Sequence, residues 1–264
     1  MWALDLDLEE FDISDNIEDG YHDLISDLVS ASTPGTLTKL STLDPRFDDF
    51  IATVEDAQVD DEKCGLTLYN DQSELDQVFS SIKILHLQGL YPQWRSPAYH
   101  GLVDLRITPT YEEPGPLSEL EFITMLRASP KLRILHFGYP IINRSEGNVY
   151  DIRVVLNELE VLQITSFELG SFGVALEPHD VFRLISPGPK PLHFAMHCHP
   201  RNEDELTVDL SFEDTEAFLE RAKVAKLCAS RYSLPDRLFR MSSHLKVLIL
   251  EEYQHTLSPS LPTN

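Results

Sequence analysis

Apolar residues recur at the first, fourth and sixth positions of short segments along the chain. The five clearest copies span residues 82–87, 102–107, 132–137, 159–164 and 245–250. In four of them the residue between the last two apolar positions is polar: His86, Arg106, His136 and Gln163. This alternation predicts strands with one buried and one exposed face. The strands of a doubly wound α/β sheet are buried on both faces and show continuous apolar runs, so this alternative is disfavoured.

The pattern L-x-x-L-x-L is typical of leucine-rich repeats. With weaker copies added, the middle apolar residues stand at positions 40, 66, 85, 105, 135, 162, 192, 227 and 248. The eight steps from 40 to 248 average 26 residues and range from 19 to 35. The sequence therefore predicts an α/β fold, an irregular leucine-rich-repeat solenoid. Its parallel strands should line the concave face, and its helices and loops the convex face.

Helix signals lie between several of these strands. Ser118 and Glu121 form a capping box ahead of an apolar helical pattern, and Pro130 ends it. Further helices are predicted after Ser73 and over residues 180–185 and 213–222. Strands separated by helices favour parallel pairing, because consecutive parallel strands need a crossover connection.

We predict a single repeat domain over residues 1–254. Within it, residues 1–36 should form an acidic, incomplete N-terminal repeat, in which Leu4, Leu6 and Leu8 alternate like a strand and residues 19–29 resemble the following helix. No polar cap precedes this repeat, which suggests either a fragment or lost upstream sequence. Residues 255–264 are rich in Ser, Thr and Pro and are predicted to be disordered.

Composition limits the cellular setting. No segment resembles a membrane span or a secretory signal, and the three cysteines do not suggest a disulfide framework. We therefore expect a soluble cytoplasmic or nuclear protein that does not bind membranes.

The net charge is −23, and residues 1–63 hold 18 acidic and three basic side chains. This balance argues against nucleic acid as a partner, because binding to phosphates requires Lys and Arg. The acidic end could attract a basic protein, although a solvated surface is the simpler interpretation.

Residues on either side of each middle apolar position should point to the exposed face. The predicted protein-binding residues are Ile84, His86, Asp104, Arg106, Ile134, His136, Val161, Gln163, Pro191, His193, Val247 and Ile249. They should form one largely apolar column and one with cationic or titratable groups. Such a surface suits protein binding, because exposed apolar residues and Arg often mark interfaces.

Catalytic chemistry finds little support. His193, His197, Cys198 and His199 form the densest group of potential metal ligands, but successive strand residues point to opposite faces. The sequence has no phosphate loop, serine elbow or H-E-x-x-H motif. Trp94 and Tyr99 could be interface anchors, but the preferred interpretation is that they pack within a convex loop. We therefore predict no catalytic residue, cofactor or metal, and no enzyme activity.

Three segments, residues 89–107, 129–137 and 185–192, resemble fungal F-box-like proteins with a leucine-rich-repeat region. The resemblance covers roughly residues 19–250 and is most specific over residues 89–107. In that family an N-terminal F-box docks on the Skp adaptor of a cullin ubiquitin ligase, and the repeats are thought to select the substrate. Residues 1–60 contain no F-box-like segment, so a Skp-type partner is expected only if an F-box lies upstream.

Two hypotheses follow. The first is a non-catalytic recognition module, the substrate-binding repeat region of an F-box-like ubiquitin-ligase adaptor. The second is a stand-alone acidic leucine-rich-repeat scaffold that binds basic proteins.

Overall fold

The computed structural model describes residues 2–7, 26–27, 29–33, 35–43, 49–53, 66–108, 117–142, 153–167, 176–199, 208–209, 212–230, 232–233 and 243–251. Its main feature is a nine-stranded sheet in which every neighbouring pair is parallel. In spatial order the strands are β1 (Trp2–Asp7), β2 (Leu37–Leu43), β5 (Ile84–Gln88), β7 (Asp104–Thr108), β9 (Ile134–Phe137), β12 (Val161–Phe167), β14 (Leu192–His199), β16 (Val224–Ser230) and β18 (Val247–Glu251). The predicted α/β class with parallel strands is confirmed.

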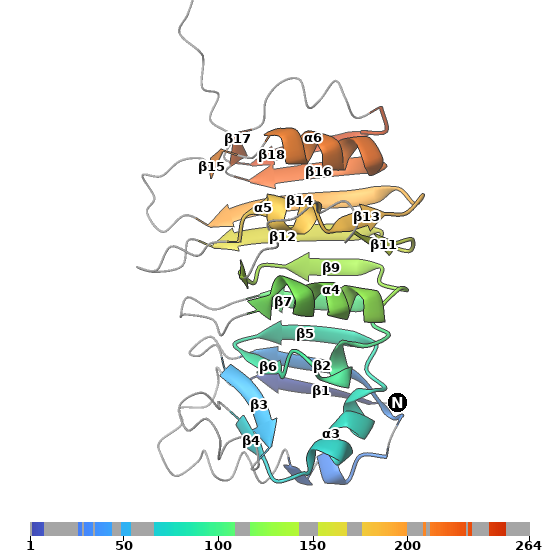
Figure 1. The fold of residues 1–264 in the computed structure, drawn as a ribbon, viewed down its shortest axis with the longest axis vertical. Coiled ribbons are helices and arrows are strands. Elements are labelled where there is room, and N and C mark those ends of the chain that lie inside the picture. Colours follow the sequence, from blue (N-terminus) through green and yellow to red (C-terminus); the bar gives the residue numbers. More distant parts are fainter. Residues whose placement is uncertain are drawn as a thin grey trace, which may run out of the picture.

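The order of the strands in the sheet follows their order in the chain without reversing, as Figure 1 shows. A doubly wound sheet reverses its strand order at a switch point, and this sheet does not. In the described part of the chain, the helices between these strands are α3 (Gln72–Phe79), α4 (Glu119–Ala128), α5 (Pro178–Phe182) and α6 (Phe212–Arg221), with the 3-10 helix η1 at Pro97–Tyr99. In Figure 1, α4, α5 and α6 cover the same face of the sheet.

Short strands form four smaller parallel sheets beside the main one. They pair β4 (Leu66–Leu68) with β3 (Asp49–Thr53) and β3 with β6 (Leu90–Pro92), β8 (Leu117–Ser118) with β10 (Ile141–Ile142), β11 (Val154–Leu156) with β13 (Ile185–Pro187), and β15 (Val208–Asp209) with β17 (Tyr232–Ser233).

The strand register aligns the middle apolar residues in one row across the sheet. This row consists of Leu40, Leu85, Leu105, Leu135, Leu162, Phe194, Leu227 and Leu248. From Leu40 to Leu227 each member is at most 3% exposed, so the row lies in the core. The pattern therefore predicts both the strands and their inward face at most positions.

Two members of the predicted row were wrong. Leu192 begins β14, and Phe194 takes its place, with its ring 5.3 Å from both Phe182 and Phe218. A phenylalanine two residues downstream fits the pattern equally well, so the spacing alone could not fix the frame. Leu66 belongs to β4 in the three-stranded sheet and not to the main sheet.

The predicted helices form with small shifts of their ends. The capping box of α4 is present: the Glu121 amide donates to Ser118 Oγ, and the Ser118 amide donates to the Glu121 carboxylate. For α3 the cap is Asp71 and not Ser73, because the Asp71 carboxylate accepts from the Glu74 amide at 2.8 Å. The helix predicted at residues 180–185 is α5, which begins at Pro178, and Ile185 opens β13.

An aromatic cluster lies where the resemblance is most specific. Tyr91, Trp94, Tyr99 and Tyr139 are at most 6% exposed, and their rings contact one another at centroid distances of 5.0–5.7 Å. The Tyr99 hydroxyl donates to the carbonyl of Pro92 at 2.9 Å, and burial raises its pKa well above the usual value of 10.0. The interpretation of Trp94 and Tyr99 as packing residues is confirmed.

Much of the predicted acidic first repeat lies outside the described residues. Of its alternating leucines, Leu4 and Leu6 belong to β1, and residues 26, 27, 29 and 30 are helical. The predicted tail at residues 255–264 lies outside the described residues. In the part of the chain that the structure describes, no helix is long and apolar enough to cross a membrane.

Candidate functional site

The inward strand residues Phe137 and Phe194 contact Phe122 of α4 and Phe182 of α5, so the alternate strand residues point to the opposite face, here called the open face. The register sorts them into two columns with neighbours about 4.8 Å apart. The first column is Lys39, Ile84, Asp104, Ile134, Val161, His193, Lys226 and Val247. The second column is Ser41, His86, Arg106, His136, Gln163, Ala195, Cys228 and Ile249. Most predicted binding residues are thus brought together in the predicted columns.

Two of the predicted positions need correction. His193 was placed in the titratable column, but it lies in the first column between Val161 and Lys226. Pro191 precedes β14 and is not one of its strand residues. Both errors come from taking Leu192 as the middle residue when Phe194 fills that position.

Asp104 organises the charged part of the open face. Arg106, two residues along the same strand, donates from Nε to Oδ1 at 3.0 Å and from a terminal nitrogen to Oδ2 at 2.9 Å. His86 on β5 places Nε2 3.3 Å from Oδ2, without the geometry of a well-formed hydrogen bond. Burial raises the pKa of Asp104, but the contacts and positive charges of His86 and Arg106 outweigh burial and lower it to about 2. Asp104 is therefore ionised and already paired.

His136 lies beside Arg106 on the next strand, β9. Burial lowers the pKa of His136, and the charges of Arg106, His86 and His197 lower it further, while Asp104 opposes them. The resulting pKa is about 4. At neutral pH the imidazole is uncharged and half-buried, so it can donate one hydrogen bond and accept another.

The apolar residues of the first column flank this charged group. Ile84, Ile134 and Val161 are half-buried on β5, β9 and β12, with Asp104 between the first two. Side chains that are apolar and partly exposed in a contiguous row offer surface that a partner could bury.

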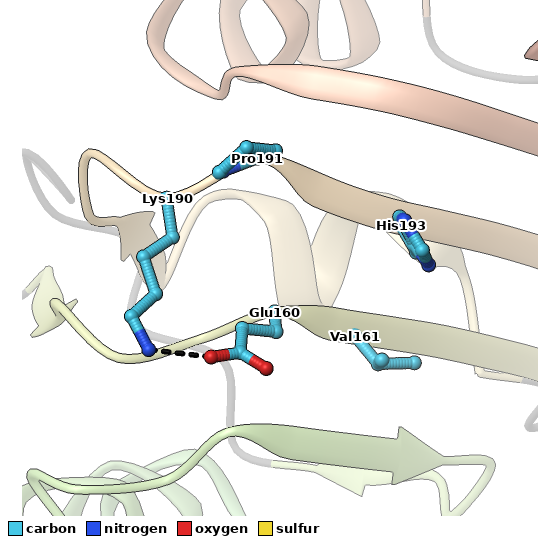
Figure 2. Close-up of a pocket in the computed structure, with 5 residues that line it drawn as sticks. All are labelled: Glu160, Val161, Lys190, Pro191 and His193. Atoms are coloured by element: carbon cyan, nitrogen blue, oxygen red, sulfur yellow. Dashed lines mark hydrogen bonds and ion pairs between the residues drawn. The ribbon is translucent and has the colours of Figure 1, made fainter.

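A pocket of about 270 Å³ opens where β12 and β14 begin. Figure 2 shows its lining residues, Glu160, Val161, Lys190, Pro191 and His193. Val161 and Pro191 supply apolar lining, and Glu160 and Lys190 form an ion pair at its edge.

This ion pair belongs to a larger charge network. Arg133 donates to Glu160 at 2.8 Å, and Lys190 also lies 2.9 Å from Glu158. Hydrogen bonds first from Arg133 and then from Lys190 lower the pKa of Glu160 to about 2. Sequence reasoning missed this network, because its members precede three different strands and share no local pattern.

The predicted absence of a metal site rested on the alternation of strand residues. On β14, His193 and His197 belong to the open face, whereas Cys198 is 3% exposed and part of the core. The His199 side chain lies outside the described residues. Within the described residues, no three His, Cys, Asp or Glu side chains are grouped so that they could hold a metal ion.

Comparisons with known proteins identify no relative of this chain. No protein-family model matches the sequence, and searches of curated proteins and of solved structures gave no match.

Proposed function

We propose that this chain is a non-catalytic protein-recognition module of the leucine-rich-repeat type, with its partner bound on the open face. The observation that carries the proposal is the alignment of the two outward columns across β2 to β18. Apolar, charged and imidazole groups of eight strands form one continuous surface there, while the helices pack on the other face. Repeat folds commonly bind partners on such a strand-lined surface.

The resemblance of residues 89–107 to F-box-like proteins supports a narrower proposal. The module would select substrates for a ubiquitin ligase, with a Skp-type adaptor as partner only if an F-box lies upstream of these repeats. In this proposal Tyr91, Trp94 and Tyr99 stabilise the fold and do not contact the partner, because all three are buried.

The second candidate is an acidic scaffold for basic proteins, which the net charge of −23 favours. Its binding residues would lie in the acidic N-terminal segment. The open face is the stronger candidate, because its described residues combine apolar and charged groups in one register.

Partner capture from cell extract, with quantitative mass spectrometry, separates the two proposals. The open-face double variant Arg106→Glu and Ile134→Asp should reduce capture at least about tenfold, because hot-spot substitutions cost roughly 1.4 kcal/mol or more. The matched control is Leu120→Asp on α4, whose side chain is 70% exposed away from the open face. Circular dichroism should show that both variants are folded.

A third variant neutralises the acidic residues between positions 5 and 23. If this variant alone loses its partners, and does so with strong salt dependence, the scaffold proposal replaces the recognition module. Unchanged capture by all three variants would contradict both proposals.

A further inference from the structure

The described outward side chains of the open face do not share the large acidic excess of the whole chain. The sequence holds 44 acidic and 21 basic side chains. On strands β2 to β18, by contrast, the acidic residues among the described side chains of the outward columns and their continuation toward the strand ends are Asp104 and Glu251. The basic or titratable residues of the same strands are Lys39, His86, Arg106, His136, His193, His197 and Lys226.

Asp104, the carboxylate at the centre of the open face, is already paired. Asp104 is 8% exposed and is held by Arg106 through two hydrogen bonds, with His86 3.3 Å away. Arg106 uses Nε and one terminal nitrogen for this pair, and its side chain remains 37% exposed. The pair fixes the guanidinium in place, so a partner carboxylate would meet a donor that is already oriented.

The apolar residues of the first column lie directly beside these cationic and imidazole groups. Ile84, Ile134 and Val161 precede His86, His136 and Gln163 by two residues on their strands. The distance from β5 to β14 is four strand spacings, or about 19 Å, which an extended segment of about six residues covers. A segment with alternating apolar and acidic side chains would match both columns.

We propose that the open face binds an extended acidic segment of a partner protein, with carboxylates on the row His86, Arg106 and His136 and apolar side chains on Ile84, Ile134 and Val161. This inference rests on the proposed recognition function and names its partner class. Charge complementarity carries it, because the described outward side chains of β2 to β18 include three cationic groups and four imidazoles against two carboxylates, on a chain whose net charge is −23.

The imidazoles should make the affinity for an acidic segment depend on pH. The groups that face His136 are Arg106 and Asp104 on β7, His86 on β5 and His197 on β14, and three of these four oppose its protonation. A bound carboxylate would favour the imidazolium, so complex formation should take up protons. Affinity should therefore rise as the pH falls toward 6.

The test uses the full chain and a fluorescein-labelled peptide of about twelve residues with alternating Glu and Leu, followed by fluorescence anisotropy. Matched peptides carry Gln or Lys in place of Glu. The Glu peptide should bind at least about tenfold more tightly than either, and about threefold more tightly at about pH 6 than at about pH 7.5.

Protein variants assign the site. Arg106→Gln should lower the affinity for the Glu peptide at least about fivefold. Arg106→Lys should lower it less, because lysine keeps the positive charge. His136→Gln should reduce the pH dependence. The control is His100→Gln, an exposed histidine that ends η1 on the side of α3. Thermal unfolding of each variant reports whether its fold is intact.

Three results would overturn the inference. Equal binding of the Glu, Gln and Lys peptides would reject an acidic partner, and wild-type affinity in Arg106→Gln would reject the site. Tighter peptide binding after neutralisation of residues 5 to 23, by about tenfold or more, would identify the acidic N-terminus of this chain as the occupant. If partner capture from cell extract still depends on Ile134 after any of these results, the proposed recognition function is kept and only the acidic partner is rejected.

Discussion

Strands β9 and β18 carry the same motif but differ on both faces. In β9 the middle residue Leu135 is fully buried, whereas its counterpart Leu248 in β18 is 40% exposed. The β9 strand lies between β7 and β12, while β18 is the last strand of the sheet and pairs with β16. The motif therefore specifies a strand and its inward side, but burial depends on what neighbouring units supply.

The outward residues of the two regions differ in polarity. The centre of the sheet presents Asp104, Arg106 and His136, whereas β18 presents Val247, which is 45% exposed, and Ile249 in the same columns. The central strands have buried inward residues and charged outward residues. The last strand has a partly exposed inward residue, Leu248, and apolar residues in the outward columns. This difference predicts where substitutions and pH affect the stability of the protein.

The largest effect should come from Leu135→Ala. The substitution leaves a cavity among fully buried side chains, so the free energy of unfolding should fall by about 2–5 kcal/mol. Urea unfolding followed by circular dichroism measures this loss. A loss below about 1 kcal/mol would contradict the closed core at β9.

His136→Gln should make the protein less sensitive to mild acid. The folded-state pKa of His136 is about 4 and the usual value is 6.5, so between these values the unfolded chain binds more protons and wild-type stability falls with the pH. From about pH 7.5 to about pH 4.5 the variant should gain about 1–2 kcal/mol relative to wild type. Ile249→Gln, at the matching position of β18, should show no such gain.

Asp104→Asn should act in a lower pH range. The pKa of Asp104 is about 2 against a usual 3.8, so its stabilising contribution is present above pH 3.8 and is lost as the pH falls toward 2. The stability difference between wild type and variant should shrink by about 1–2 kcal/mol over this range. Urea unfolding at a series of pH values measures it, with Val247→Asn as the control in β18. A constant difference would show that the Arg106 and His86 contacts do not hold the carboxylate ionised.

The smallest effect should come from Leu248→Ala. Its side chain is already partly exposed, so the substitution should cost less than about 1 kcal/mol. The same urea experiment as for Leu135→Ala applies. A loss equal to that of Leu135→Ala would mean that β18 is covered in solution and that the two strands are equivalent.

The candidate site could be predicted from the sequence only in part. Alternation placed Ile84, His86, Arg106 and His136 on one face, because strand residues two apart point the same way. The Arg133, Glu160 and Lys190 network was missed, since residues from separate segments meet only after the strands have paired. His193 was misplaced because Leu192 and Phe194 both satisfy the pattern and packing against Phe182 and Phe218 decides between them.

The sequence by itself determined the local features: the strands, their inward residues and the capping box of α4. These depend on backbone geometry and on neighbours within a few positions, which the side-chain order encodes directly. The tertiary structure decided which strands joined the main sheet, placed Leu66 in a separate sheet and left Leu248 partly exposed. It also set the charge state of Asp104 and His136, because burial and charges from other strands determine the free energy of protonation.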